Sequence, residues 1–505
     1  MEKTLIKKLF FLLSSISLVL LIQPIIQSFF FPIELEARES TLWLHILTIK
    51  EGINIYDPSI VAYANQAHGP VDPIFKYIIH KLFFFLEPWQ VSRLNNVLFF
   101  LSIFIINYLK LKNKNNIIFI GFISISIYSL IFLFTKSFQG RADVTAMLLI
   151  SWLCFFCCDQ NVYKKLFKII FIAFIFSIII MTNWRFLPLC MAIVFFPVYH
   201  VDKFEDIYKL KRIFFSISFI LLSFIPFLII LYLLFDFEIK KYFDYFIGFF
   251  YFENHFSVNH YLVGFKNLAR IEKFYLLIIL FTTYLIKNFY ETNDYNFKFF
   301  LKILMSTLVF LVSLVSYLYN YIGGGIYYFT PVILFLWYLI LFDYSKKEFK
   351  FNHNKYISIL IIFFSVVLIG MALKNSIRTS KGLYANYYKA LELHNYLSKI
   401  TNNNSKVLSE SLHFHKKKYT GEKIDIGDLI SYRSTQVGGN YHKTYKSYLK
   451  ELSNGKYDYI IHNFTGTHHI NKLIDNQDYK VLKTFSNNYS NIGDVFILRK
   501  NFLSK

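Results

Sequence analysis

Charged residues are scarce in this chain of 505 residues. Only 17% of the sequence is Asp, Glu, Lys or Arg, whereas about a quarter of an ordinary soluble protein is charged. The deficit lies in residues 1–373, where long apolar runs alternate with short polar clusters, while residues 374–505 read like a soluble domain. This pattern excludes a soluble fold for the whole chain and predicts a membrane protein with a soluble C-terminal domain.

Acidic residues are also fewer than basic ones, 32 against 54, which gives a net charge of +22. In a soluble protein such an excess would suggest nucleic acid. Here many of the basic residues lie between apolar runs, where membrane orientation explains them. We therefore predict membrane lipids as partners and no nucleic acid.

Cysteine is rare, and the four residues present lie in apolar runs: Cys154, Cys157 and Cys158 in one, and Cys190 in another. Their spacing is not that of a zinc site, so we interpret them as small packing residues. The sequence also has no P-loop, dinucleotide fingerprint or G-x-S-x-G elbow. We predict no cofactor and no metal-ligating residues, and a function that is metal-independent or weakly metal-dependent, since a divalent metal is neither indicated nor excluded by the sequence.

Apolar runs long enough to span a bilayer recur along residues 1–373. A hydrocarbon core of about 30 Å needs about 20 apolar residues as helix. The runs predict about eleven transmembrane helices, near residues 9–31, 94–109, 116–135, 142–158, 166–182, 186–200, 213–235, 273–287, 300–319, 326–343 and 356–373. The first is predicted to be a retained anchor, because it is long enough to span and no small-x-small cleavage site follows it.

The connections between these runs differ in basic content. With a cytoplasmic N-terminus, the lysine clusters near residues 112, 165, 209 and 346 fall in cytoplasmic connections, as the positive-inside rule requires. An odd number of spans then places the C-terminus outside. We predict a protein of the inner or plasma membrane with two large outer loops, 32–93 and 236–272.

Two domains follow from this layout: a transmembrane domain, 1–373, and an extracytoplasmic α/β domain, 374–505. The second shows an amphipathic helix pattern over 383–400 and strand patterns over 406–409, 457–461 and 494–499. Within the first outer loop, the apolar patch 74–86 predicts helices that lie in the membrane interface.

Carboxylates just outside the first span are the first candidates for chemistry. Glu34, Glu36 and Glu39 lie beside one another at the edge of a low-dielectric region, where a carboxylate can act as a base. The alternative is an acidic helix start that complements the helix dipole. Arg141 and Asp143 lie at the outer start of a later span, where ionisable groups are costly unless paired or functional.

A basic outer loop holds Lys240 and Lys241, against the topology rule. A lipid phosphate or anionic outer-leaflet lipids would explain them. Tyr56 and His68 lie in or beside turns of the first outer loop. His68 is either a ligand contact or a capped surface histidine.

These motifs resemble the GT-C membrane glycosyltransferases, which include protein O-mannosyltransferases and aminoarabinose transferases of lipid A. The first outer loop of that family has an acidic residue, an amphipathic helix, Gly-x-x-Tyr and a Pro-containing turn. Here these read as Glu39, the helix 40–51, Gly52 to Tyr56, and His68-Gly69-Pro70. Arg141-Ala142-Asp143 is similar to the family's Arg-x-Asp. The chain has Thr182-Asn183-Trp184-Arg185 where relatives often have Thr-Lys-Gln.

The resemblance implies transfer of a hexose or pentose from a polyprenyl-phosphate donor to a glycan, lipid or protein acceptor on the outer face. It implies a catalytic role for Glu39 as base, with Glu36 in reserve, and for Asp143. Arg141 is the implied phosphate ligand. Further substrate contacts would come from Arg185, Lys240, Lys241, Tyr56 and His68.

Two other functions stay open at this point. A transporter or flippase of lipid-linked saccharides would use the same outer surface without chemistry, and should show inverted repeats and ionisable groups at mid-span. A membrane anchor with a binding tail would retain its activity in the tail alone.

Overall fold

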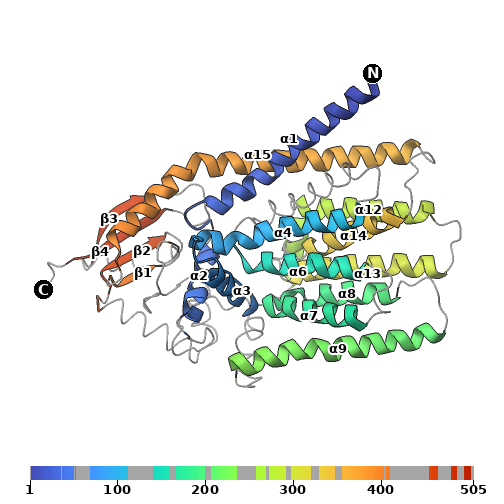
Figure 1. Cartoon of the computed structure of the whole chain (residues 1–505), viewed down its shortest axis with the longest axis horizontal. Coiled ribbons are helices and arrows are strands. Elements are labelled where there is room, and N and C mark those ends of the chain that lie inside the picture. The colour runs from blue at the N-terminus through green and yellow to red at the C-terminus, as the bar shows by residue number, and fades with distance from the viewer. Residues whose placement is uncertain are drawn as a thin grey trace.

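The computed structural model is mostly helical. It describes residues 2–35, 37–50, 52, 69–111, 140–158, 166–199, 206–235, 258–268, 272–291, 297–319, 329–346, 355–402, 405–409, 414, 454–455, 457–463, 479–485 and 494–501. The helices are α1 (Glu2–Phe30), α2 (Ala37–Lys50), α3 (Val71–Leu82), α4 (Pro88–Leu111), α6 (Ala142–Cys157), α7 (Leu166–Thr182), η2 (Trp184–Phe186), α8 (Leu187–Tyr199), α9 (Asp206–Phe235), α11 (Val258–Leu268), α12 (Glu272–Glu291), α13 (Phe297–Tyr319), α14 (Phe329–Lys346) and α15 (Lys355–Ile400). Figure 1 shows the long helices as one bundle, with α2 and α3 at the end nearest the C-terminal sheet.

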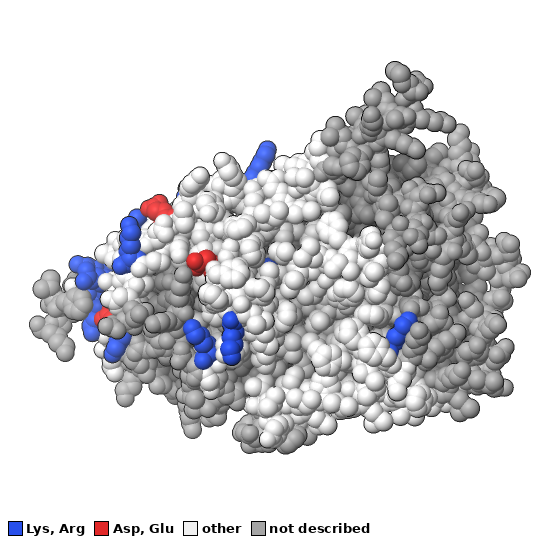
Figure 2. Space-filling model, viewed as in Figure 1, with Lys and Arg blue, Asp and Glu red and all other residues white. Residues whose placement is uncertain are grey.

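Every predicted span coincides with a helix of the structure except 116–135, which lies outside the described residues. Two helical stretches of the described part are long and apolar enough to cross a membrane, Pro88–Ile106 and Ile213–Leu234, and shorter apolar helices occupy the other positions. Figure 2 shows that charged side chains on this face gather toward the sheet end and are sparse over the bundle. The predicted helical fold is confirmed, and the number of spans stays a prediction.

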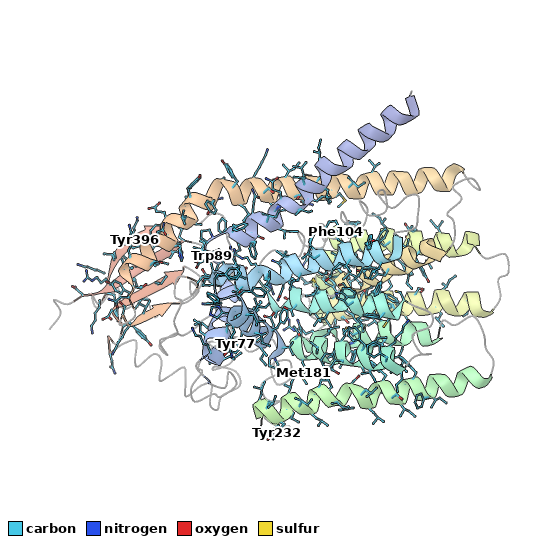
Figure 3. All side chains as sticks on the ribbon, in the orientation of Figure 1. Tyr77, Trp89, Phe104, Met181, Tyr232 and Tyr396 are labelled. Atoms are coloured by element: carbon cyan, nitrogen blue, oxygen red, sulfur yellow. The ribbon has the colours of Figure 1, made fainter. Side chains whose placement is uncertain are left out.

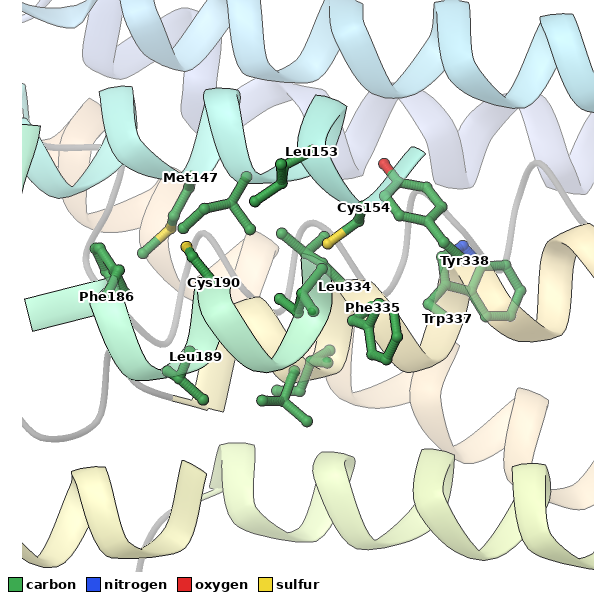
Figure 4. Close-up of a cluster of buried hydrophobic side chains, with 14 of the residues drawn as sticks. Met147, Leu153, Cys154, Phe186, Leu189, Cys190, Leu334, Phe335, Trp337 and Tyr338 are labelled. Carbon is green, nitrogen blue, oxygen red and sulfur yellow. The ribbon is translucent and has the colours of Figure 1, made fainter. Parts of the chain in front are cut away.

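The centre of the bundle is a large apolar cluster where α6, α8 and α14 meet (Figure 4). Met147 and Cys154 of α6 lie opposite Cys190 of α8 and Phe335 of α14, and all four side chains are fully buried. The four cysteines are buried thiols within this cluster. They fill space as small apolar side chains, as predicted from their spacing.

Helix α15 runs unbroken through the predicted domain boundary at residues 373 and 374. Its C-terminal half packs on a sheet of order β1-β2-β4-β3, made of β1 (Val407–Ser409), β2 (Tyr459–Asn463), β3 (Tyr479–Phe485) and β4 (Val495–Lys500). β1 and β2 are parallel and the other pairs antiparallel. The predicted helix and three of the strands are confirmed. β3 was missed because its sequence, YKVLKTF, does not alternate apolar and polar residues.

The segment between α1 and α2 belongs to the core of this C-terminal part. Phe31, Ile33 and Leu35 are buried against Leu393 of α15 and Ile497 of β4. Burial of apolar side chains on both sides stabilises the junction between bundle and sheet. In Figure 3, Trp89 and Tyr77 lie at this junction, and Tyr396 lies over the sheet.

Candidate functional site

Glu39 lies in the first turn of α2 with its side chain fully buried. Its two oxygens each accept a hydrogen bond of 2.9 Å from the guanidinium of Arg93. The backbone N–H groups of Leu35, at 2.7 Å, and of Gly140 donate to the same carboxylate. A carboxylate has about four acceptor positions, so those of Glu39 are filled. This geometry favours a structural role for Glu39, and its role as base stays a prediction.

Arg93 uses every N–H group that its guanidinium has. Besides Glu39, it donates to the carbonyl oxygens of Ser28 and Phe31, both at 2.6 Å, and of Ile33 at 2.5 Å. The side chain is 0% exposed. Arg93 therefore ties the end of α1 and the segment that follows it to α2 and α4.

The start of α4 determines where Arg93 lies. Pro88 is the first residue of the helix, a position where its missing N–H costs nothing. The side chain of Gln90 accepts a hydrogen bond from the N–H of Glu87 at 3.0 Å, as in a capping box. The next turn then carries Ser92 and Arg93 on the buried side.

Helix α3 contributes a second buried ion pair. Asp72 and Lys76, four residues apart on one helix face, are 3.0 Å apart and fully buried. Lys76 also donates to the carbonyl oxygen of Gly140 at 2.8 Å. Thr145 and Asn95 donate to the other oxygen of Asp72, Asn95 at 3.3 Å. Sequence reasoning missed this pair, although opposite charges at a spacing of four residues were a usable signal.

Gly140 connects the two ion pairs. Its N–H bonds to Glu39 and its carbonyl oxygen to Lys76. A Cβ at this position would lie 2.5 Å from the carbonyl oxygen of Ser92, so only glycine lets the backbone approach α4 this closely. The backbone that leads to Arg141 is therefore held from both sides.

A third ion pair lies at the start of α6. Arg141 precedes the helix and Asp143 lies in its first turn, with 3.1 Å between guanidinium nitrogen and carboxylate oxygen. The side-chain amide of Asn183 donates to the other oxygen of Asp143 at 2.8 Å. Arg141 is 7% and Asp143 3% exposed, whereas Glu39 and Asp72 are 0% exposed. Of these three carboxylates, Asp143 is the one with a residual exposed fraction.

Asn183 is placed by the end of α7. Its side-chain oxygen accepts the N–H of Arg185 at 3.2 Å and so caps η2. Gly69 donates to the carbonyl of Thr182 at 2.9 Å, and a Cβ at Gly69 would collide with the carbonyl oxygen of Met181. The first outer loop thus packs directly on the turn that carries Asn183. The Thr182–Arg185 departure from the family pattern was the sequence signal for this residue.

The structure brings together three of the predicted site residues, Glu39, Arg141 and Asp143, and places Arg185 beside them. Glu34 is buried and its carboxylate accepts the N–H of Phe414 at 2.7 Å. The other predicted residues, Glu36, Tyr56, His68, Lys240 and Lys241, lie outside the residues that the structure describes. Within the described ranges, no group of three or more His, Cys, Asp or Glu could hold a metal ion.

Comparison with known proteins identifies the fold. No family model matches the sequence, and no curated protein matches it significantly. The crystal structure of ArnT from Cupriavidus metallidurans in the apo state matches with a TM-score of 0.55 at 11% identity, over 97% of this chain and 98% of that chain. ArnT from the same organism bound to undecaprenyl phosphate matches with a TM-score of 0.47 at 11% identity, over 97% of each chain. ArnT is an aminoarabinose transferase of GT-C type. The resemblance drawn from the sequence is thus confirmed at the level of the fold.

Proposed function

We propose that this chain, which has the GT-C fold of ArnT, is a membrane glycosyltransferase that uses a polyprenyl-phosphate sugar. It transfers a hexose or pentose to a glycan, lipid or protein acceptor on the extracytoplasmic face. The observation that carries the proposal is the convergence of Arg141 and Asp143 with two buried ion pairs at one end of the bundle.

Arg141 is proposed to bind the phosphate of the donor. A guanidinium forms strong, charge-assisted hydrogen bonds with phosphate oxygens. When Arg141 turns to a phosphate, its 3.1 Å pairing with Asp143 weakens, and an oxygen of that carboxylate becomes available. Arg185, on the neighbouring η2, is the second candidate for this role, and Lys240 and Lys241 are weaker ones.

Asp143 is proposed to take the proton of the acceptor. The acceptor hydroxyl or amine transfers its proton to the carboxylate, and its oxygen or nitrogen bonds to the anomeric carbon. The bond from that carbon to the phosphate oxygen breaks on the opposite side, and the phosphate leaves with the electron pair. The configuration inverts, and Arg141 stabilises the charge that develops on the leaving phosphate.

In this scheme Glu39 does not contact the substrate and acts indirectly. Its carboxylate holds the N–H of Gly140 and hence the backbone that presents Arg141. The alternative, in which Glu39 itself is the base and Glu36 its reserve, requires one of its four hydrogen bonds to open first. Tyr56 and His68 are proposed to contact donor or acceptor.

The distribution of buried charge favours an enzyme over a flippase. A transporter is expected to carry ionisable groups near the membrane midplane. In the described part of the chain, the buried Asp, Glu, Lys and Arg side chains all lie near α2, α3 or the starts of α4 and α6: Glu34, Glu39, Asp72, Lys76, Arg93, Arg141 and Asp143. The charges therefore gather at one end of the bundle, where an outer active site is proposed.

The exposed apolar residues at the end of α3 support placing the charged end of the bundle at the membrane surface. Its polar residues Asp72 and Lys76 are buried, while Leu82, Phe84 and Phe85, at and just beyond its end, are 67%, 82% and 69% exposed. Contiguous exposed aromatic side chains are typical of contact with lipid rather than water. This orientation is consistent with an integral protein of the inner or plasma membrane.

Transfer from a panel of polyprenyl-phosphate sugars tests the proposal, with the full chain in lipid nanodiscs and donor binding measured separately. Arg141→Gln is expected to weaken donor binding and turnover together, because it removes the phosphate ligand. The control Arg499→Gln removes an arginine of β4, away from the site, and should leave both unchanged. Saccharide translocation without transfer from any donor would replace the proposal by the flippase.

A further inference from the structure

The C-terminal part of the chain reaches into the packing around the candidate site. Phe414, which follows β1, is 1% exposed and belongs to an apolar cluster of α2, α3 and α4. Its ring lies edge-on to Trp43 of α2, with 6.1 Å between centroids. Its N–H donates to the carboxylate of Glu34 at 2.7 Å. Phe414 is therefore held by the first outer segment from two sides.

Phe414 also lies against Arg93. The central carbon of the guanidinium is 5.7 Å from the centroid of the Phe414 ring, within the range of a cation–π contact. The N–H groups of Arg93 are all directed to Glu39 and to three carbonyl oxygens. These hydrogen bonds occupy the edges of the guanidinium, so an aromatic ring is the kind of neighbour that its face can still accept.

The contact is reciprocal. While Phe414 is buried among the helices of the first outer loop, Phe31, Ile33 and Leu35 of the segment before α2 are buried in the core of the C-terminal sheet. Leu35 supplies one of the hydrogen bonds to Glu39. Each part thus completes the core of the other, and the ion pair of Glu39 lies between them.

We propose that Phe414 is a positioning residue through which the C-terminal domain holds the candidate site in place. It fixes the guanidinium of Arg93, which fixes the carboxylate of Glu39, which holds the N–H of Gly140 just before Arg141. The effect on transfer rests on the proposed function, whereas the mechanical link from Phe414 to Gly140 does not.

Hydrogen–deuterium exchange on the full chain in nanodiscs tests the link without any assay of activity. Phe414→Leu keeps an apolar side chain but removes the aromatic face. We expect it to speed exchange in the peptides that contain Leu35 and Gly140 by about 3- to 30-fold, the factor equivalent to one cation–π contact. Phe414→Tyr retains the ring and should exchange like the wild type.

Phe485→Leu is the matched control. Phe485 is also an aromatic residue of the C-terminal sheet, 9% exposed and packed on Lys483 and Tyr396 instead of Arg93. Because Phe485 shares an apolar cluster with Leu35, the control is read at Gly140, where exchange should stay unchanged. An equal rise at Gly140 in Phe485→Leu, wild-type exchange at Gly140 in Phe414→Leu, or a rise in Phe414→Tyr as large as in Phe414→Leu would each overturn the proposal.

Transfer assays on the same variants add the functional readout. Phe414→Leu should lower transfer by the same factor as it raises exchange, and Phe414→Tyr should restore it. If the wild type transfers no sugar, the proposed function fails while the exchange result still decides the link. If the wild type transfers and Phe414→Leu matches it in rate despite faster exchange, the positioning role is overturned.

Discussion

Glu39 and Lys76 hold opposite sides of the same residue. Glu39 accepts the N–H of Gly140, and Lys76 donates to its carbonyl oxygen at 2.8 Å. Each of the two charged residues also has a buried partner of opposite charge: Glu39 pairs with Arg93, and Lys76 pairs with Asp72. A buried charge is tolerated only when it is paired and hydrogen-bonded, and here the pairing also fixes a backbone.

Gly140→Ala should disrupt this arrangement. The new Cβ would meet the backbone of Ser92 at 2.5 Å, so α4 or the 140 backbone must shift, at a cost of about 1–3 kcal/mol in the free energy of unfolding. Transfer should fall as well, because the N–H leaves Glu39. Melting temperature and transfer rate measure the two effects. Gly382→Ala on α15 is the control: no atom lies within 4 Å of its Cβ, so it should melt at or above the wild-type temperature.

Arg93→Gln should be among the most destabilising single changes at this end of the protein. It leaves the carboxylate of Glu39 buried without its counter-charge, which typically costs about 3–5 kcal/mol. Lys483→Gln breaks a pair of similar length, 3.0 Å to Glu392, but those side chains are 38% and 62% exposed. Exposed pairs contribute about 0–1 kcal/mol. Equal losses of melting temperature in the two variants would refute the structural role of the Arg93 pair.

Asp143→Asn separates the two hypotheses for the base. If Asp143 takes the proton, the amide variant should lower turnover by about 10²–10⁴-fold. Its loss of melting temperature should be smaller than that of Glu39→Gln, because the side chains of the Arg141–Asp143 pair are 9% and 4% exposed whereas those of the Arg93–Glu39 pair are 0% exposed. The exposed Glu392→Gln controls for loss of a carboxylate. A stable Glu39→Gln protein with turnover lowered by that factor would return the base role to Glu39.

His45 makes stability depend on pH. This residue of α2 is 3% exposed, its Nε2 makes no hydrogen bond within the described part of the chain, and burial lowers its pKa from 6.5 to about 4. Between these values the unfolded chain binds a proton that the folded chain does not. Stability is therefore fully present above pH 6.5 and falls as the pH drops toward 4, by about 3 kcal/mol. Unfolding of the wild type and of His45→Gln from pH 7 to 4 measures this, and identical pH dependence would contradict it.

Reporter fusions test the membrane orientation. Basic clusters in alternate connections predict a cytoplasmic reporter after Lys114 and after Lys350 and an outer reporter at Lys505. A cytoplasmic reporter at Lys505 would show that the span count is even.

Hydropathy alone was enough to predict the positions of the bundle helices, because a span must present a continuous apolar stretch whatever its neighbours are. The family motifs likewise pointed to Glu39, Arg141 and Asp143 before any contact was known. Strand β3 was not predicted, because lysines interrupt the alternation of apolar and polar residues and its pairing partner, β4, comes later in the chain.

What the tertiary structure alone decided is which charges meet. In the sequence, Arg93 is a single polar residue at the start of a predicted span. Because Arg93 and Glu39 are 54 residues apart, no local pattern indicates their ion pair. Phe414 is separated from Glu34 by 380 residues, so no local pattern could place it beside the outer loop. Helix and strand periodicity report only neighbours a few residues apart. The sequence therefore determined the helices and the candidate chemistry, while packing between distant segments determined which of these residues pair with one another.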